Sequence, residues 1–203
     1  MKRGVYLDVG GVLMDDVMEP ARRDASCARL SERLGFSAEA VLAAFLEMHK
    51  SLDLGIAQMD DLAARLGVTG QALTDEFVAL HSFRKHTLDL IREIRLAGHP
   101  VGLATNFAYS VLKQTMSTVD FPPLDALCCS SNIGAIKPSE RFYIVAEEML
   151  GTTDIVFVDD REPNLVGARR RGWSTIHAAP GWDQILRAEL GIPTLSHDTA
   201  RPK

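Results

Sequence analysis

Aspartates follow two apolar segments of the chain, one near each end. Asp8 comes after residues 4–7, Gly-Val-Tyr-Leu, while Asp159 and Asp160 come after residues 155–158, Ile-Val-Phe-Val. Short apolar runs bounded by turn residues are typical of buried strands. A carboxylate where such a strand ends is poorly solvated and needs a metal ion or another cation as its partner. Each aspartate alone also fits a simpler role, which is to accept hydrogen bonds from a turn or a helix start.

Together, the three carboxylates indicate a site for a hard cation. Mg²⁺ takes oxygen ligands and commonly combines a few carboxylates with water and a substrate phosphate. Asp8, Asp159 and Asp160 would suit it. Asn164 lies four residues after Asp160, in the first turn of a predicted helix, where it could hold a metal-bound water or brace an acid.

Two further positions carry groups that suit an anionic oxygen. Thr105 and Asn106 offer a hydroxyl and an amide between a predicted strand and a predicted helix, although most such pairs only cap helices. Lys137 precedes Pro138, which stiffens the chain there, and its compact charge could point at a phosphate or at Asp8. A lysine before proline is more often a surface charge, so neither signal is specific by itself.

The elements that would position these residues alternate between helix and strand from residue 86 onward. Strands are predicted at 100–104, 124–129, 155–158 and 174–178, and helices at 87–96, from 109, and at 138–150, 162–171 and 181–190. This alternation predicts an α/β fold, a parallel sheet with helices on both faces. Ligands of such sheets bind beyond the carboxyl ends of the strands, where the polar residues above would converge.

Residues 15–84 have a different character, because they lack strand-like runs and show helical spacing of apolar residues. We expect a first helix to start near Pro20 and end before Gly35, and a second to be capped by Ser37. A third is led by Asp60 and stops at Gly67, and a fourth runs over 70–83. Four short helices joined by glycine-containing turns predict a small helical bundle.

Composition narrows the class of protein. A chain of 203 residues fits one domain, or one with a smaller insertion, and its formal charge of −5 gives no support for nucleic-acid binding. No apolar stretch is long enough to span a membrane and the N-terminus lacks a secretion signal, so we expect a cytoplasmic protein. Cys27, Cys128 and Cys129 are predicted to be free, buried thiols rather than zinc ligands.

Taken in chain order, these motifs resemble those of a known family. The segments Asp8-Val9-Gly10-Gly11-Val12, Ala104-Thr105-Asn106, Lys137-Pro138 and Asp159-Asp160 with Asn164 are similar to the haloacid dehalogenase superfamily of hydrolases. The resemblance implies a Rossmann-like core of residues 1–14 and 85–203. It also implies an α-helical cap, residues 15–84, inserted after the first strand.

The resemblance further implies a role for each motif. Asp8 would be the nucleophile, Lys137 would steady it, and Thr105, with Asn106 beside it, would bind the phosphoryl oxygens. Mg²⁺ would be held by Asp8, by the carbonyl of Gly10 and by Asp159 and Asp160, with Asn164 in support.

One position departs from the pattern of the family's phosphatases. They usually carry a second aspartate two residues after the nucleophile as general acid and base, and Gly10 stands there. Such catalysis is typically worth ~10²–10⁴-fold in rate. The protein could therefore act on good leaving groups, use Asp15, Asp16 or His49 instead, or be a weak catalyst.

Three functions follow as alternatives. The leading one is a Mg²⁺-dependent phosphatase of a small phosphorylated metabolite, acting as a monomer or homodimer through an aspartyl-phosphate on Asp8. The others are a metal-independent 2-haloacid dehalogenase and a catalytically weak binding or regulatory protein. No chemistry is assigned to the remaining histidines, His81, His86, His99, His177 and His197.

Overall fold

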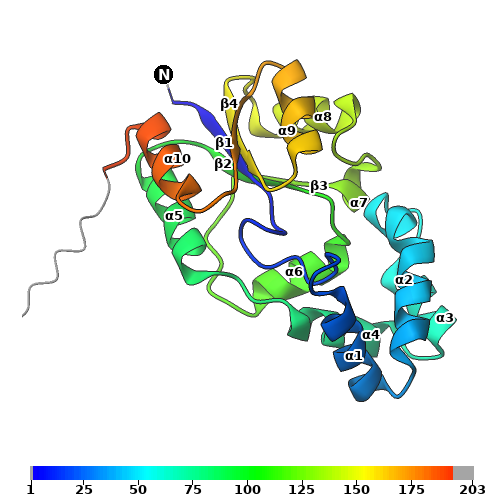
Figure 1. Ribbon diagram of the computed structural model, residues 1–203. Helices are drawn as coiled ribbons and strands as arrows, with labels where there is room; N and C mark the ends of the chain where they lie inside the picture. The colour runs from blue at the N-terminus through cyan, green and yellow to red at the C-terminus, as the bar shows by residue number, and fades with distance from the viewer. Residues whose placement is uncertain (1, 194–203) are drawn as a thin grey trace, which may run out of the picture.

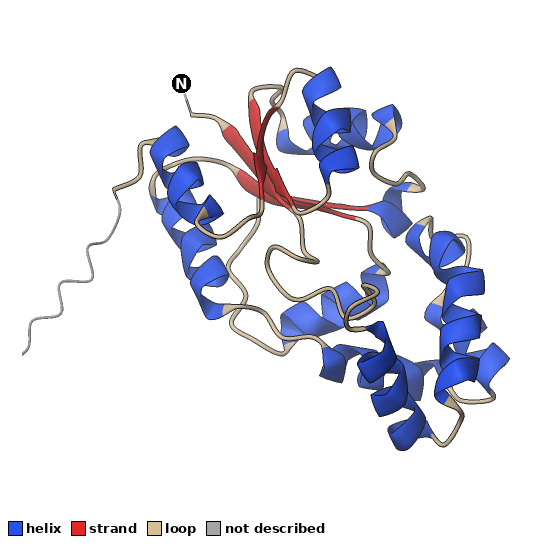
Figure 2. Cartoon of the chain, in the orientation of Figure 1, coloured by secondary structure: helices blue, strands red, loops and turns tan. Residues whose placement is uncertain are grey.

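The computed structural model describes residues 2–193, and a parallel sheet of five strands lies at its centre (Figure 2). The order across the sheet is β3-β2-β1-β4-β5, and every neighbouring pair is parallel. The predicted α/β fold is thus confirmed. The strands are β1 (Gly4–Leu7), β2 (Val101–Thr105), β3 (Ala126–Cys129), β4 (Ile155–Asp159) and β5 (Ser174–His177).

Helices cover both faces of the sheet (Figure 1). Because successive side chains of a strand point to opposite faces, each face has its own hydrophobic core. Val5 and Leu7 pack in the core that contains α5 (Lys85–Leu96) and α10 (Trp182–Leu190). Tyr6 belongs to the opposite core, which contains α8 (Glu140–Leu150) and α9 (Glu162–Arg170).

The register of the sheet brings the chemistry-bearing positions together. Leu7 of β1 is paired with Leu103 of β2 on one side and with Val158 of β4 on the other. The residues that follow these partners therefore share one edge. Asp8 lies beside Asp159 on one side and beside the end of β2 on the other.

The segment between β1 and α5 forms four helices with a hydrophobic core of their own. That core includes Leu30 of the first helix, Val41 of the second, Leu62 of the third and Leu73 of the fourth. The helices lie together below the carboxyl edge of the sheet in Figure 1. They are α1 (Arg23–Leu34), α2 (Ala38–Asp53), α3 (Met59–Leu66) and α4 (Gly70–Leu80).

The helix stop and start signals act at the predicted places. Gly35 and Gly67 end α1 and α3 in the left-handed conformation, and the Ser37 hydroxyl accepts a hydrogen bond from the Ala40 N–H at the start of α2. The first helix begins at Arg23 rather than near Pro20, because residues 17–22 form turns and a bend instead of a helix.

Two chain segments connect the helical segment to the sheet, and they lie side by side. Met14 and Phe83 form an antiparallel bridge, and the Arg84 guanidinium donates to the carbonyls of Gly11 (3.0 Å) and Val12 (2.9 Å). Arg84 also forms an ion pair with Asp15. The division into a core and a cap at these segments stays a prediction.

Two more helices line the space between the sheet edge and the four helices. α6 (Tyr109–Ser117) follows β2 and packs on α4, while α7 (Ser130–Ile133), which was not predicted because it is a single turn, follows β3. No helix within residues 2–193 is long and apolar enough to cross a lipid bilayer. His197 lies outside the described residues.

Candidate active site

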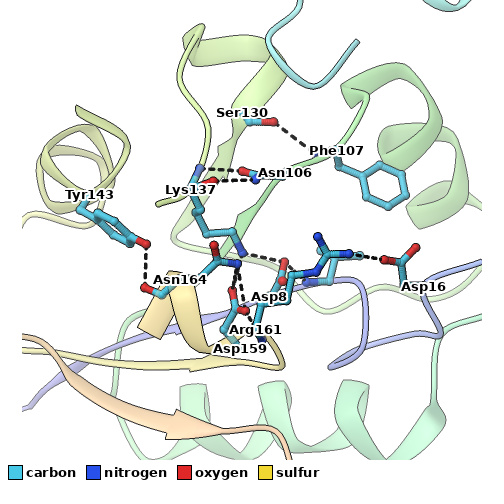
Figure 3. A network of polar contacts seen from close by, with 11 residues as sticks. Asp8, Asp16, Asn106, Phe107, Ser130, Lys137, Tyr143, Asp159, Arg161 and Asn164 are labelled. Carbon is cyan, nitrogen blue, oxygen red and sulfur yellow. Dashed lines mark hydrogen bonds and ion pairs between the residues drawn. The ribbon is translucent and has the colours of Figure 1, made fainter. Parts of the chain in front are cut away.

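Asp8 is the centre of a buried polar network at the carboxyl edge of the sheet (Figure 3). Its Oδ1 accepts hydrogen bonds from the Val9 N–H (2.7 Å) and from the Lys137 Nζ (3.0 Å). Burial, with Asp159 adding to it and Lys137 opposing it, raises the pKa of Asp8 above its ordinary value. Among residues 2–193 no donor reaches the Oδ2 of Asp8, so that oxygen is left for another partner.

Lys137 connects two of the three predicted metal-binding carboxylates. Its side chain is 1% exposed, and its Nζ lies 2.6 Å from Asp159 Oδ2 as well as 3.0 Å from Asp8 Oδ1. Burial opposes the charge, but Asp8 and Asp159 together hold the pKa of Lys137 above its usual value. Lys137 is therefore a buried cation that contacts Asp8, and the surface-charge interpretation is wrong.

Asp159 is fully buried, and both of its carboxylate oxygens accept hydrogen bonds from protein donors. Beside Lys137, it accepts from the Arg161 N–H (2.8 Å), and the Asn164 amide donates to both of its oxygens at 3.0 Å. Tyr143 donates to the Asn164 carbonyl (2.7 Å) and fixes the start of α9. Of the two roles expected for Asn164, it takes the one of bracing an acid, and Asp159 orients Lys137.

The residues present fit a divalent cation. Carboxylate oxygens of Asp8, Asp159 and Asp160 lie within 4.8 Å of one another. Burial raises the pKa of Asp160, and Asp159 adds to this effect. Three carboxylates against the single ammonium of Lys137 leave a local charge of −2, which a Mg²⁺ ion would balance. Since Asp159 is already saturated by its protein donors, Asp8 and Asp160 have the oxygens most available to a metal.

Asn106 has a role that the sequence did not indicate. Its Oδ1 accepts from the Lys137 backbone N–H (2.8 Å), and its Nδ2 donates to the Lys137 carbonyl (3.1 Å). The amide therefore ties the end of β2 to the segment that carries Lys137. Thr105, which is 1% exposed, instead contributes to the wall of the cavity above Asp8.

Gly10, which stands where the family's phosphatases usually carry a second aspartate, lies next to the carboxylate of Asp16. A Cβ atom on Gly10 would lie 3.5 Å from the Asp16 Cβ and 3.9 Å from its Oδ2. Asp16 is 26% exposed and pairs with Arg161 at 2.9 Å (Figure 3). Asp15, in contrast, pairs with Arg22 and Arg84 on the connecting segments and does not line the cavity.

A cavity of about 310 Å³ joins the sheet edge to the four helices. Its floor contains Asp8, Gly10, Thr105, Lys137 and Asp160. Its other walls come from the helical segment, from the residues between β2 and α6 and the start of α6, and from the start of α9 with Arg161 and Asn164. Most of these wall residues are apolar. The polar ones carried by the helices are His49, Asp53 and His81.

This geometry agrees with the family comparison. Residues 2–172 match the sequence model for haloacid dehalogenase-like hydrolases. The chain belongs to that family. The family resemblance noted from the sequence is thereby confirmed.

Among proteins of this family, the chain is similar to members with different chemistries. It is 29% identical over 108 residues to an (S)-2-haloacid dehalogenase of Pseudomonas fluorescens, a match that covers 52% of this chain and 47% of that protein. The chain thus spans about half the length of the curated relatives it matches.

Solved structures share the fold over nearly the whole chain. A predicted hydrolase of the family from Porphyromonas gingivalis has a TM-score of 0.72 at 20% identity, covering 93% of this chain and 98% of that one. A family enzyme from Bacteroides thetaiotaomicron, solved in complex with magnesium and inorganic phosphate, has a TM-score of 0.70 at 16% identity and covers 92% and 100%. At these identities the likeness establishes the fold.

Sequence reasoning missed two residues of the cavity. Arg161 directly follows the Asp159-Asp160 pair, and the sequence motifs assigned it no role. Asp53 is the last residue of α2, where a negative charge opposes the helix dipole. An acid at the carboxyl end of a helix was the one signal in the sequence that could have indicated it.

Proposed function

We propose that this protein is a Mg²⁺-dependent phosphatase that hydrolyses a small phosphate monoester through an aspartyl-phosphate on Asp8. The observation that carries the proposal is the cluster of three carboxylates around one buried lysine, whose charge is incomplete without a divalent cation. The family enzyme from Bacteroides thetaiotaomicron, which was solved with magnesium and phosphate, supports it.

The chain's own residues have distinct parts in the proposed reaction. The Oδ2 of Asp8 attacks phosphorus, the bond to the ester oxygen breaks, and water then cleaves the acyl phosphate to release phosphate and restore Asp8. Lys137 holds Oδ1, and the Thr105 hydroxyl and the start of α6 face the phosphoryl oxygens. Bound Mg²⁺ would be held by Asp8, Asp160 and the Gly10 carbonyl, with Asp159 in support, and would neutralise phosphoryl charge.

The leaving oxygen needs a proton that Gly10 cannot supply. Asp16 places a carboxylate beside the side-chain direction of Gly10, with Arg161 and the Met18 N–H holding it. We therefore favour Asp16 over Asp15 and His49 as the group that exchanges this proton. If no group does so, the substrates are restricted to good leaving groups.

A second candidate is hydrolysis of a 2-haloacid, which the Pseudomonas relatives favour by their names. That reaction also begins at an aspartate but needs no metal. Its substrate is itself a carboxylate, and the cavity already has Asp8, Asp16, Asp53 and Asp160 in its walls. In a metal-independent reaction no divalent cation offsets the repulsion between these carboxylates and the substrate, whereas Mg²⁺ would offset it for a phosphate ester, so the phosphatase is the better supported proposal.

The deciding experiment measures phosphate release from aryl phosphates, with Mg²⁺ and with a chelator, for the natural protein and for Asp8→Asn. We expect activity that needs Mg²⁺ and falls by at least about 10³-fold in the variant, because the nucleophile is lost. Equal activity in both proteins would exclude Asp8 as the nucleophile. Halide release from a 2-haloacid without metal would favour the dehalogenase, and tight phosphate binding without turnover would favour a binding protein.

A further inference from the structure

Asp53 is a carboxylate that the proposed reaction does not use. It ends α2 and lines the same cavity as Asp8 and Thr105. Asp53 joins the cavity wall from the helical segment, whereas Asp8 joins it from the sheet edge. A phosphate ester bound at Asp8 would have to extend its leaving group into the part of the cavity that the helical segment lines.

The carboxylate of Asp53 has no partner within the protein. Across residues 2–193, no hydrogen bond or ion pair is formed with its side chain, which lies in the wall of the cavity. The other carboxylates of the cavity are accounted for, since Asp8 contacts Lys137 and Asp16 contacts Arg161. Asp160 belongs to the cation cluster. Asp53 is thus the one carboxylate among the described cavity residues that has neither a protein partner nor a place in the cation cluster.

Holding this unpaired charge is costly for the fold. Burial raises the pKa of Asp53 to about 6, while His49, Arg161 and Lys137 oppose this effect and Asp16 adds to it. The dipole of α2 is also unfavourable at its carboxyl end. Burial and the helix dipole both disfavour the charge of this carboxylate. A carboxylate that is kept in a cavity without a protein partner in spite of this is typical of a group that binds a ligand.

Other residues of the cavity wall indicate the rest of that ligand. Phe45, Met59, Leu62 and Phe77 also line the cavity and offer an apolar surface. They suit a hydrocarbon body, whereas Asp53 suits a hydrogen-bond donor. The cavity of about 310 Å³ limits the whole molecule to a small one.

We propose that Asp53 selects the leaving group by accepting a hydrogen bond from a hydroxyl or ammonium group at the end remote from the phosphate. This inference rests on the proposed phosphatase function. It names the substrate class as small phosphate monoesters with an apolar body and a terminal donor. Esters that end in a methyl group or in an anion are selected against, because they leave the carboxylate unpaired or face it with a like charge.

The test uses binding, so that it does not depend on turnover. Alkylphosphonates of one chain length, ending in methyl, hydroxyl or ammonium, are titrated into the full chain with Mg²⁺ in a calorimeter. We expect the hydroxyl and ammonium compounds to bind roughly 10- to 100-fold more tightly than the methyl compound, the factor that a hydrogen bond to a charged group is worth.

Asp53→Asn then assigns the preference to this residue. Its amide oxygen still accepts a hydrogen bond but carries no charge, so the ammonium preference should disappear. A hydroxyl preference that persists in this variant while the ammonium preference is lost identifies charge as the selected property. Glu47→Gln is the matched control, because it removes one charge from the same helix at the surface, where Glu47 pairs with Arg65.

Three results would overturn the proposal. They are equal binding of all three phosphonates, preferences that are unchanged in Asp53→Asn, and no binding of any phosphonate in Mg²⁺. The proposed phosphatase function fails separately, when aryl phosphates are not turned over although phosphonates bind.

Discussion

At the scale of single residues, the role of each aspartate depends on whether its carboxylate oxygens already accept hydrogen bonds from the protein. Asp159 uses both oxygens on protein donors, whereas Asp8 and Asp160 keep oxygens available. Residue type alone would assign the three aspartates equally to a metal. The hydrogen bonds separate them into one that positions Lys137 and two that can bind a cation.

The paired glycines after Asp8 make a residue-scale prediction, since they differ in what a side chain would meet. Gly11 has φ +73°, and a Cβ there would lie 2.3 Å from Asp160 Oδ2, whereas one on Gly10 would make an ordinary contact at 3.5 Å. We expect Gly11→Ala to lower the free energy of unfolding by about 1–2 kcal/mol and to abolish Mg²⁺-dependent activity.

Gly10→Ala is the matched control for this pair. Its free energy of unfolding should stay within about 0.5 kcal/mol of the natural protein. Urea unfolding and phosphate release measure both variants. Equal loss of stability in the two would show that the contact with Asp160 does not distinguish these positions.

At the scale of elements, the site is assembled from the ends of three neighbouring strands and the segments that follow them. Parallel pairing sets β1 between β2 and β4, and that order brings Asp8 level with Asp159. Lys137 lies outside the sheet, in the segment before α8, so a further contact is needed to position this segment beside Asp8. Asn106 provides the connection, because it bonds both backbone groups of Lys137.

Asn106→Ala tests whether this residue positions Lys137 or binds substrate. Loss of two hydrogen bonds should lower the free energy of unfolding by about 1–3 kcal/mol. If Asn106 acts through Lys137, kcat for an aryl phosphate falls while KM changes little. A raised KM with unchanged kcat would instead support the substrate contact predicted from the sequence. Asn132→Ala, which removes an exposed amide from α7, is the control.

At the scale of the whole molecule, the cavity exists because the four helices sit over the sheet edge. Contacts of α4 with α6 and of α2 with α7 close two sides of it. Gly55, at φ +70°, lets the chain after α2 lie against the Ser131 carbonyl. The sheet edge thereby supplies the cation cluster, and the helices supply an apolar wall with one free acid.

A stability measurement tests the charge balance of the whole site. Since only the folded chain brings Asp8 and Asp160 together, Mg²⁺ should raise the free energy of unfolding. At tenfold excess over its dissociation constant, the increase is about 1.4 kcal/mol. Urea unfolding with Mg²⁺ and with a chelator measures it, and Asp160→Asn should reduce the difference. An identical midpoint in both conditions would contradict a cation site here.

The sequence by itself determined the sheet and the positions of Asp8, Thr105-Asn106 and Asp159-Asp160 at strand ends. Apolar runs, glycine stops and the Ser37 cap act over a few residues, so they are readable without the fold. The start of α1, the single turn of α7 and the start of the connecting segments were not readable, because they depend on contacts with distant residues.

Only the tertiary structure decided how the site residues divide their roles. That Lys137 is buried between two carboxylates, that Asn106 holds its backbone and that Asp16 lies beside Gly10 are facts about residues far apart in sequence. Asp53 is the clearest case. Local pattern places it only at a helix end, and its lack of a partner exists only once α2 has packed over the cavity.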